Sequence, residues 1–173
     1  YEGRCAMETG VDRQAETYME EPSRAEDAKD QCADWQYMQE LFQMREVDVR
    51  VYSPLALAYI GDAVYDLIIR SLVLNEGNRQ VQKMHRQTSS MVQASAQAKM
   101  ASALQERMSG EEHAVYKRGR NARSMSPAKN QSVSDYHKAT GFEALIGYLY
   151  LKREWKRMLE LIKAGLDALE SEQ

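Results

Sequence analysis

Two acidic residues lie inside otherwise apolar stretches, and they are the residues of this sequence best suited to chemistry. Asp62 lies in the run YIGDAVY, and Glu143 lies in the run GFEALIG. A carboxylate among apolar neighbours is costly to desolvate unless it meets a cation or a hydrogen-bond donor. If the two stretches pack side by side, their carboxylates repel each other unless a divalent cation lies between them. The pair therefore favours a metal site, although a single acid of this kind more often faces solvent at a helix edge.

Magnesium is the cation that such a pair predicts. Mg²⁺ prefers oxygen ligands, keeps several waters and commonly takes one or two carboxylates together with substrate phosphates, so Asp62 and Glu143 would suffice. Beside a phosphodiester, the ion activates water and stabilises charge on the attacked phosphate and the leaving oxygen. Asp66, one turn after Asp62, is either a third ligand or the ion-pair partner of Arg70 at i+4, and we favour the ion pair.

Cationic and amide side chains gather in the segment RGRNARSMSPAKNQSVS, which we expect to be a loop. The arginine fork matches phosphate geometry, although loop residues of this kind can also simply be solvated. Lys83 and Arg86, on a helical stretch, are weaker candidates for contact with a phosphate backbone. His137 is assigned no role, because a lone histidine at such a position is more often a surface or capping residue. The candidate phosphate contacts in the loop are Arg118, Arg120, Asn121, Arg123 and Lys129.

The net charge of −3 over 173 residues hides an uneven distribution. Residues 1–34 carry ten Asp or Glu against four Lys or Arg, whereas residues 67–130 carry eleven Lys or Arg against four Glu. A basic surface attracts a phosphate backbone through Coulomb attraction and counterion release. The central part of the chain is therefore compatible with a nucleic-acid partner, and a solvated helix surface is the alternative.

The remaining composition predicts a cytoplasmic protein. The two cysteines, Cys5 and Cys32, show no spacing typical of a zinc site or a disulfide framework. No apolar run approaches the roughly 20 residues that span a bilayer, and the first residues lack the pattern of a signal peptide. We therefore expect no membrane association and no export.

Helical elements must position these residues, because no alternating Val, Ile or Thr run is long enough for a sheet. The fold class is predicted to be all-α. Gly61 and Gly147 would let helix backbones approach closely where the acid-bearing stretches cross. Ser53 and Pro54 form an N-cap and first-turn pair, and Ser134 is expected to cap the second acid-bearing helix. The expected helices are 55–74, ending near Asn75 and Gly77, then 79–108, 111–117, 134–151 and 155–169.

The chain is predicted to hold one domain and an extension. Residues 1–34 are acidic and poor in large aliphatic residues, so they cannot offset the entropy of ordering. We expect them to be a disordered N-terminal extension or a remnant of processing or expression. One hypothesis is that this segment mimics phosphate and covers the basic face. Residues 35–173 are expected to form the catalytic domain.

Four segments, in their order and spacing, resemble the Mini-ribonuclease III family. LALAYIGDAVYDLIIR resembles the signature helix of ribonuclease III, and ATGFEALIGYLYL resembles the later acidic helix of that domain. KMHRQTSSMVQASAQAKM and KRGRNARS resemble the Mini branch in particular. The resemblance covers roughly residues 41–169.

The resemblance implies an all-helical homodimer that binds an RNA duplex and cuts each strand by magnesium-assisted attack of water. The products would carry a 5′-phosphate and a 3′-hydroxyl. Asp62 matches the catalytic aspartate of the family, and Glu143 matches its catalytic glutamate. The implied substrate is the precursor of 23S ribosomal RNA in the large subunit, and a ribosomal-protein helper could present it.

Two departures from the wider ribonuclease III pattern bear on the number of bound metal ions. Ala58 stands where the longer enzymes carry a glutamate, and Thr140 stands where they carry an aspartate. We expect no double-stranded RNA-binding domain after these helices, so duplex binding would depend on the basic surface and on salt. The rival functions are a catalytically inactive RNA-binding or ribosome-associated protein of the same fold, and a helical dimerisation module without an RNA role.

Overall fold

The computed structural model describes residues 35–122 and 132–171. The chain divides into two compact units between Arg45 and Glu46. In the first unit, residues 35–41 form a helix. The predicted disorder of residues 1–34 and the two cysteines lie outside the described residues, and the predicted domain boundary at residue 35 stays a prediction.

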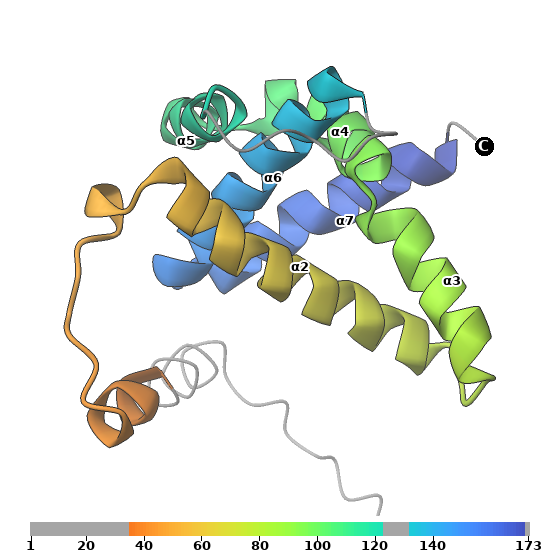
Figure 1. The fold of residues 1–173 in the computed structure, drawn as a ribbon, viewed down its shortest axis with the longest axis horizontal. Helices are drawn as coiled ribbons and strands as arrows, with labels where there is room; N and C mark the ends of the chain where they lie inside the picture. Colours follow the sequence, from red (N-terminus) through yellow and green to blue (C-terminus); the bar gives the residue numbers. More distant parts are fainter. Residues whose placement is uncertain (1–34, 123–131, 172–173) are drawn as a thin grey trace, which may run out of the picture. The chain divides into compact units, whose positions relative to one another are not determined.

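The described residues of the second unit are mainly helical (Figure 1). The described residues contain no strand, so the prediction of an all-α fold is confirmed. None of the helices described is long and apolar enough to cross a membrane. In chain order the elements are η1 (Val49–Val51), α2 (Pro54–Asn75), α3 (Val81–Val92), α4 (Ala94–Ala103), η2 (Gln105–Arg107), α5 (Gly110–Arg120), α6 (Val133–Leu151) and α7 (Trp155–Ser171).

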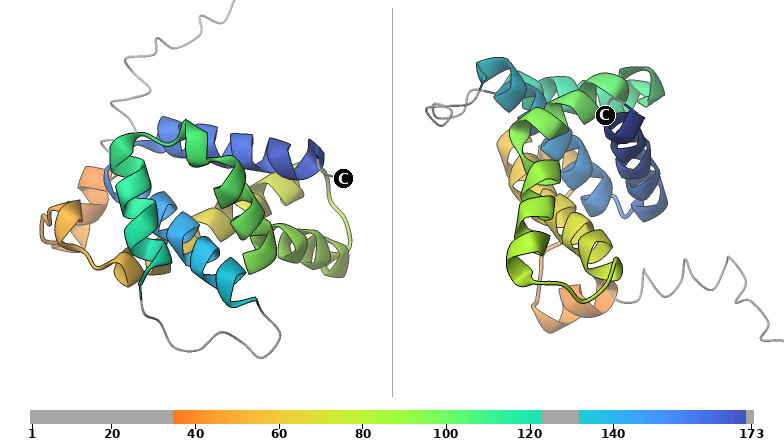
Figure 2. Two further views of the ribbon diagram at one scale, coloured as in Figure 1. Left: turned by 90° about the horizontal axis from the view of Figure 1, so that it is seen from above. Right: turned by 90° about the vertical axis from the view of Figure 1, so that its right-hand side faces the viewer.

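Helix α6 is the centre of this unit. Its residues from Ala144 to Leu149 are all buried, which a helix achieves only when neighbours cover every side of it. Helix α2 lies against it, α4 and α5 cover another side, and α7 also contacts it (Figures 1 and 2). Helices α2, α4, α5 and α7 are therefore placed by their packing on α6.

Helices α2 and α6 cross with their backbones in direct contact. A Cβ atom built on Gly61 would lie 1.8 Å from the carbonyl oxygen of Glu143, and one built on Gly147 would lie 2.0 Å from the carbonyl oxygen of Leu57. Real Cβ atoms do not approach backbone this closely, so only glycine fits at both positions. The predicted close approach at Gly61 and Gly147 is confirmed.

A second glycine crossing joins α5 to α6 and corrects the sequence prediction. We expected the helix to end at Lys117 and the loop to begin at Arg118, but α5 continues to Arg120. Gly119 is buried within this helix, where an added Cβ would lie 2.7 Å from the Cβ of Ala144. This glycine therefore permits helix packing rather than ending the helix.

The predicted single helix 79–108 is broken into α3 and α4. Gln93 adopts extended dihedral angles, φ −64° and ψ 149°, and α4 begins at Ala94. The break turns α4 onto α6, where it buries Ala96, Ala98 and Met100. The carbonyl of Met91 accepts a hydrogen bond from the hydroxyl of Tyr65 at 3.1 Å, which compensates part of the interrupted helical ladder.

The remaining helix boundaries follow local capping. Ser53 accepts a hydrogen bond from the backbone N–H of Ala56, as its position before Pro54 predicted. At the start of α6, Ser132 and not Ser134 is the N-cap, and its hydroxyl accepts from the backbone N–H of Asp135. Helices α2 and α7 otherwise match their predicted extents closely.

A buried ion pair fixes the start of α5 to α7. The Glu112 side chain is 7% exposed, and its oxygens accept from Nε and an Nη of Arg157 at 2.8 and 2.9 Å. Glu112 also closes a capping box with Ser109, accepting from the Ser109 backbone N–H. These donors lower the pKa of Glu112, so the contact is lost only when acid protonates this carboxyl.

We predict that Gly61→Ala destabilises the protein by about 3 kcal/mol or more, because the new methyl group would overlap the Glu143 carbonyl and force α2 away from α6. The measurement is chemical denaturation followed by circular dichroism. Gly110→Ala is the matched control, since a Cβ there would meet nothing within 4 Å. Equal stability of the two variants would show that the α2–α6 contact does not constrain the fold.

Candidate active site

The two acids singled out from the sequence lie at the crossing of α2 and α6. Asp62 directly follows Gly61 on α2, and the Glu143 carbonyl is the backbone atom that Gly61 faces most closely. The glycine contact therefore brings both carboxyl groups to one place from residues eighty-one positions apart in the chain. Their closeness is visible in their electrostatics, because the charge of Asp62 acts on Glu143.

Burial and like charge hold both carboxyls toward their protonated form. The pKa of Glu143 rises to about 8 because the side chain is removed from water, with a further contribution from the negative charge of Asp62. Asp62 is more exposed, yet desolvation by the protein and then the charge of Asp66 raise its pKa as well. A cation between the two carboxyls would relieve this repulsion.

Gln97 is a residue of this site that sequence reasoning missed. It projects from α4, it is 0% exposed, and its amide lowers the pKa of Glu143. Neither its amide nitrogen nor its amide oxygen reaches full hydrogen-bond geometry with a protein partner. The available signal was a glutamine on the same helix face as Ala94 and Ala101, which lie three residues before it and four after it.

Asp66 forms the ion pair that its spacing predicted. Its Oδ2 accepts from Nε of Arg70 at 2.5 Å. Both side chains are partly exposed, so the pair contributes little to stability. In this arrangement Asp66 is engaged by Arg70 rather than free to bind a cation.

The two positions without acids are occupied by well-accommodated side chains. Ala58 is buried one turn before Asp62. Thr140 is also buried, and its hydroxyl donates to the Tyr136 carbonyl at 3.0 Å. Within the described residues no group of three or more His, Cys, Asp or Glu is placed to hold a metal ion. A metal at this site would therefore rest on two carboxylates, with an amide beside them.

Aromatic packing holds the acid-bearing helices in register. Tyr65 on α2 and Phe142 on α6 are fully buried and meet edge to face, with ring centroids 5.2 Å apart and planes at 89°. The Tyr65 hydroxyl reaches the end of α3 through its bond to Met91. Phe142 directly precedes Glu143, so this contact limits movement of the glutamate relative to α2.

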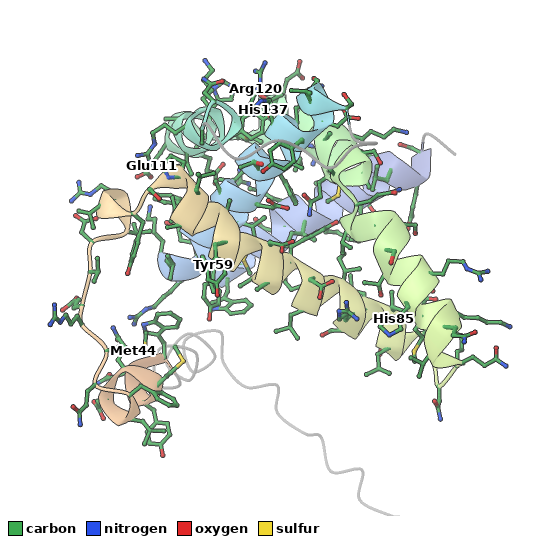
Figure 3. All side chains as sticks on the ribbon, in the orientation of Figure 1. Met44, Tyr59, His85, Glu111, Arg120 and His137 are labelled. Carbon is green, nitrogen blue, oxygen red and sulfur yellow. The ribbon has the colours of Figure 1, made fainter. Side chains whose placement is uncertain are left out.

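The candidate phosphate contacts fall into two groups. Arg118 and Arg120 are exposed in the last turn of α5, and Asn121 is its C-cap. Figure 3 labels Arg120 at the end of α5 and His137 in the part of α6 that precedes Glu143. Lys83 and Arg86 are exposed on α3, the helix that carries the labelled His85 away from Arg120. The structure thus brings Arg118, Arg120 and Asn121 together and places Lys83 and Arg86 elsewhere, while Arg123 and Lys129 lie outside the described residues.

Comparison with known proteins identifies the family. The ribonuclease III domain matches residues 55–154, a range that contains both acids. Mini-ribonuclease 3 of Clostridium tetani is 44% identical over 124 residues, which are 71% of this chain and 82% of that protein. Mini-ribonuclease 3 of Symbiobacterium thermophilum is 38% identical over 130 residues, 75% of this chain and 100% of that protein. A crystal structure of a Fusobacterium nucleatum protein matches with a TM-score of 0.64 and 29% identity, covering 68% of this chain and 96% of that one.

The family resemblance that the four sequence segments suggested is therefore confirmed. Match lengths of this extent cover nearly all of the helical unit, and the similar crystal structure supports the same fold. The chain belongs to the ribonuclease III family, in its Mini-ribonuclease III branch, and is an endoribonuclease.

Proposed function

We propose that this endoribonuclease cleaves double-stranded RNA through Mg²⁺-assisted attack of water on the phosphodiester, leaving a 5′-phosphate and a 3′-hydroxyl. The observation that carries the proposal is the pair of carboxyls at the α2–α6 crossing, where burial raises the pKa of both groups and the charge of Asp62 raises that of Glu143 further. A chain gains no stability from such a pair, so its use is in binding a cation.

The residues present fit a divalent cation. Asp62 and Glu143 would hold the ion, and the unpartnered amide of Gln97 lies beside them. Two carboxylates are enough for Mg²⁺, which fills its other positions with water and phosphate oxygen. When bound, the ion supplies Lewis-acid activation of water and stabilises charge on the phosphate. The role of Glu143 is to lose its proton and present an oxygen, while α2 and α6 keep both carboxyls in place.

Basic side chains support binding to a phosphate backbone. Arg118, Arg120 and Asn121 offer donors at the end of α5, and Arg123 and Lys129 follow in the chain. On α3, Lys83 and Arg86 provide a second set of cations away from the first. Two separated sets suit an extended duplex better than a small ligand, because phosphates recur along the whole length of a duplex.

An exposed apolar stripe on α2 supports a homodimer. Leu55, Tyr59, Ala63 and Leu67 follow one another at four-residue intervals, so they share one face of the helix. Tyr59 is 83% exposed and Leu67 is 63% exposed. We propose that a second copy covers this stripe in a two-fold arrangement, which would bring the Asp62 of each subunit beside a shared surface for the duplex.

The proposed substrate is the precursor of 23S ribosomal RNA, cut in the cytoplasm during maturation of the large ribosomal subunit. A protein that recognises an RNA duplex reads mainly its shape, its phosphates and its 2′-hydroxyls. Selection of one precursor would then come from the fold of that RNA or from a ribosomal protein that presents it. Comparison of cleavage rates on the precursor and on an unrelated duplex, with and without added ribosomal proteins, tests this choice.

One observation favours a second candidate, an RNA-binding protein of the same fold without cleavage activity. Ala58 and Thr140 remove two acids from the pattern of the longer enzymes, and both side chains are accommodated without strain. The retained pair, Asp62 and Glu143, argues against this candidate, because a pure RNA binder gains nothing from carboxylates that face phosphate.

We predict that the purified protein makes staggered cuts in a labelled RNA duplex with Mg²⁺, and that EDTA, Asp62→Asn or Glu143→Gln each lowers the rate at least about 100-fold. Gel analysis of product ends provides the measurement, with 5′-phosphates expected. Glu106→Gln is the matched control, since Glu106 is exposed on η2 and should keep wild-type activity. Duplex binding without cleavage, across divalent metals and with a ribosomal precursor, would favour the inactive RNA-binding protein.

The inactive Asp62→Asn protein also tests the RNA-binding surface without cutting its ligand. Its affinity for the duplex should fall steeply with salt concentration. Adding Arg118→Ala and Arg120→Ala should reduce the slope of log affinity against log salt concentration by about one for each arginine removed. An unchanged salt dependence would remove the end of α5 from the proposed surface.

We predict that Glu143→Gln stabilises the metal-free protein at pH 9. The unfolded-state pKa of this carboxyl is 4.5 and the folded-state value is about 8, so the protonated form contributes stability that is lost as pH rises between them. At pH 9 the free energy of unfolding of the variant should exceed that of wild type by on the order of 2 kcal/mol, and near pH 4 the two should be equal. Chemical denaturation in the presence of EDTA provides the measurement. A difference between Glu143→Gln and wild type that stays constant from pH 4 to pH 9 would contradict the assignment.

We predict that wild-type protein sediments as a dimer at micromolar concentration and that Tyr59→Glu sediments as a monomer, because a carboxylate would have to be buried in the contact. Analytical ultracentrifugation provides the measurement. Leu159→Glu is the control, since Leu159 is 44% exposed on α7, outside the stripe. A monomeric wild type, or a dimeric Tyr59→Glu variant, would overturn the proposed interface.

A further inference from the structure

Gln97 is a buried polar side chain whose hydrogen-bonding capacity the described residues do not fully satisfy. It is 0% exposed, and neither amide atom makes a hydrogen bond of normal geometry among the described residues, although the amide lowers the pKa of the adjacent Glu143. Leaving a buried polar group unsatisfied costs about 1–3 kcal/mol, and a leucine or methionine would fill the same space without that cost. An amide in this position therefore indicates a partner that joins it in the functional state.

The surroundings of Gln97 limit what that partner can be. Its neighbours on α4 include the buried residues Ala96, Ala98 and Met100, which offer no polar side-chain oxygen or nitrogen. The polar group beside it is the Glu143 carboxyl on α6, close enough for the amide to act on it. Gln97 therefore adjoins the proposed metal site from a third helix, which neither acid occupies.

The nitrogen and the oxygen of the Gln97 amide require different hydrogen-bond partners. Its nitrogen carries two donors, and an ionised Glu143 can accept one of them. Its oxygen only accepts, so an ionised carboxylate cannot satisfy it, and its partner must be a donor. Water that accompanies a hydrated cation is such a donor, and it would lie next to the carboxylate that holds the ion.

We infer that Gln97 is a positioning residue, which orients the Glu143 carboxylate through its N–H group and holds a water of the hydrated Mg²⁺ through its oxygen. The inference rests on the proposed function, because it presupposes that Asp62 and Glu143 bind the cation. It adds a third side chain to that site, and this side chain acts through Glu143 and water rather than on the RNA. Groups in such a position typically change metal affinity by 10- to 100-fold.

The test measures metal binding directly, with Mn²⁺ as the probe and electron paramagnetic resonance of free Mn²⁺ as the readout. Gln97→Met keeps the size of the side chain and removes both polar atoms. We expect it to bind Mn²⁺ at least about 10-fold more weakly than wild type, while its melting temperature without metal is equal or higher. It should also need at least 10-fold more Mg²⁺ for half-maximal cleavage.

Two further variants make the result decisive. Gln97→Asn keeps the amide but withdraws it by one methylene, so it should weaken Mn²⁺ binding in the same direction and serves if the methionine variant does not fold. Gln105→Met is the matched control, because the Gln105 amide nitrogen donates to the Ala101 carbonyl and its oxygen lies 3.1 Å from Nε2 of His113, so neither atom is engaged with the two acids and Mn²⁺ binding should not change. Mn²⁺ affinity within twofold of wild type for Gln97→Met, or for Gln97→Asn, would overturn the inference.

Glu143→Gln separates failure of this inference from failure of the proposed function. If Glu143→Gln abolishes Mn²⁺ binding while Gln97→Met leaves it unchanged, the metal site stands and the role of Gln97 is wrong. If neither substitution changes Mn²⁺ binding, the proposed metal site itself is wrong, and the inference fails with it.

Discussion

The contact of the α2 and α6 backbones at Gly61 and Gly147 is the constraint on which the rest of the site depends. A side chain at either position would overlap a carbonyl of the opposite helix, so the helices meet at this distance only because both residues are glycine. Asp62 follows one of these glycines, and the Glu143 carbonyl faces it. The same contact that lets α6 occupy the centre of the helical unit thus brings the two carboxyls together.

The carboxyl pair makes the metal-free protein less stable than its packing would otherwise allow. Burial and the charge of Asp62 raise the pKa of Glu143 to about 8, so ionising this residue opposes folding. Well-packed surroundings offset that cost, notably the edge-to-face contact of Tyr65 with Phe142. The Glu143 carboxyl is therefore held in place by buried neighbours, as expected for a preorganised binding site.

Sequence reasoning succeeded where one local signal decided the structure. The Ser53–Pro54 cap fixed the start of α2, and the glycines in the acid-bearing runs predicted a close crossing. It failed where tertiary packing overrode the local signal: the segment from Arg118 was predicted to be a loop, but α5 continues to Arg120 and Gly119 serves the contact with α6.

The break at Gln93 has no glycine or proline to mark it, because the turn is stabilised by packing of α4 on α6 and by the distant hydroxyl of Tyr65. Gln97 was missed for a related reason. The helical register of α4 indicates only that Gln97 shares a face with apolar residues. Its importance depends on its place beside Glu143, forty-six positions later, which the register does not show.

The reduced number of acids gives this site its particular character. Ala58 lies one turn from Asp62, and Thr140 lies one turn from Glu143. Carboxylates at these positions would add further repulsion to the pair, in which the pKa of Glu143 is already raised. Thr140 satisfies its own hydroxyl on the Tyr136 carbonyl, so it adds no ligand. With fewer charges to attract a cation, orientation of the two remaining carboxyls matters more. A neutral amide such as Gln97 can orient Glu143 without adding negative charge. A third carboxylate at that position would instead add to the repulsion within the pair, which is a physical reason for a glutamine there.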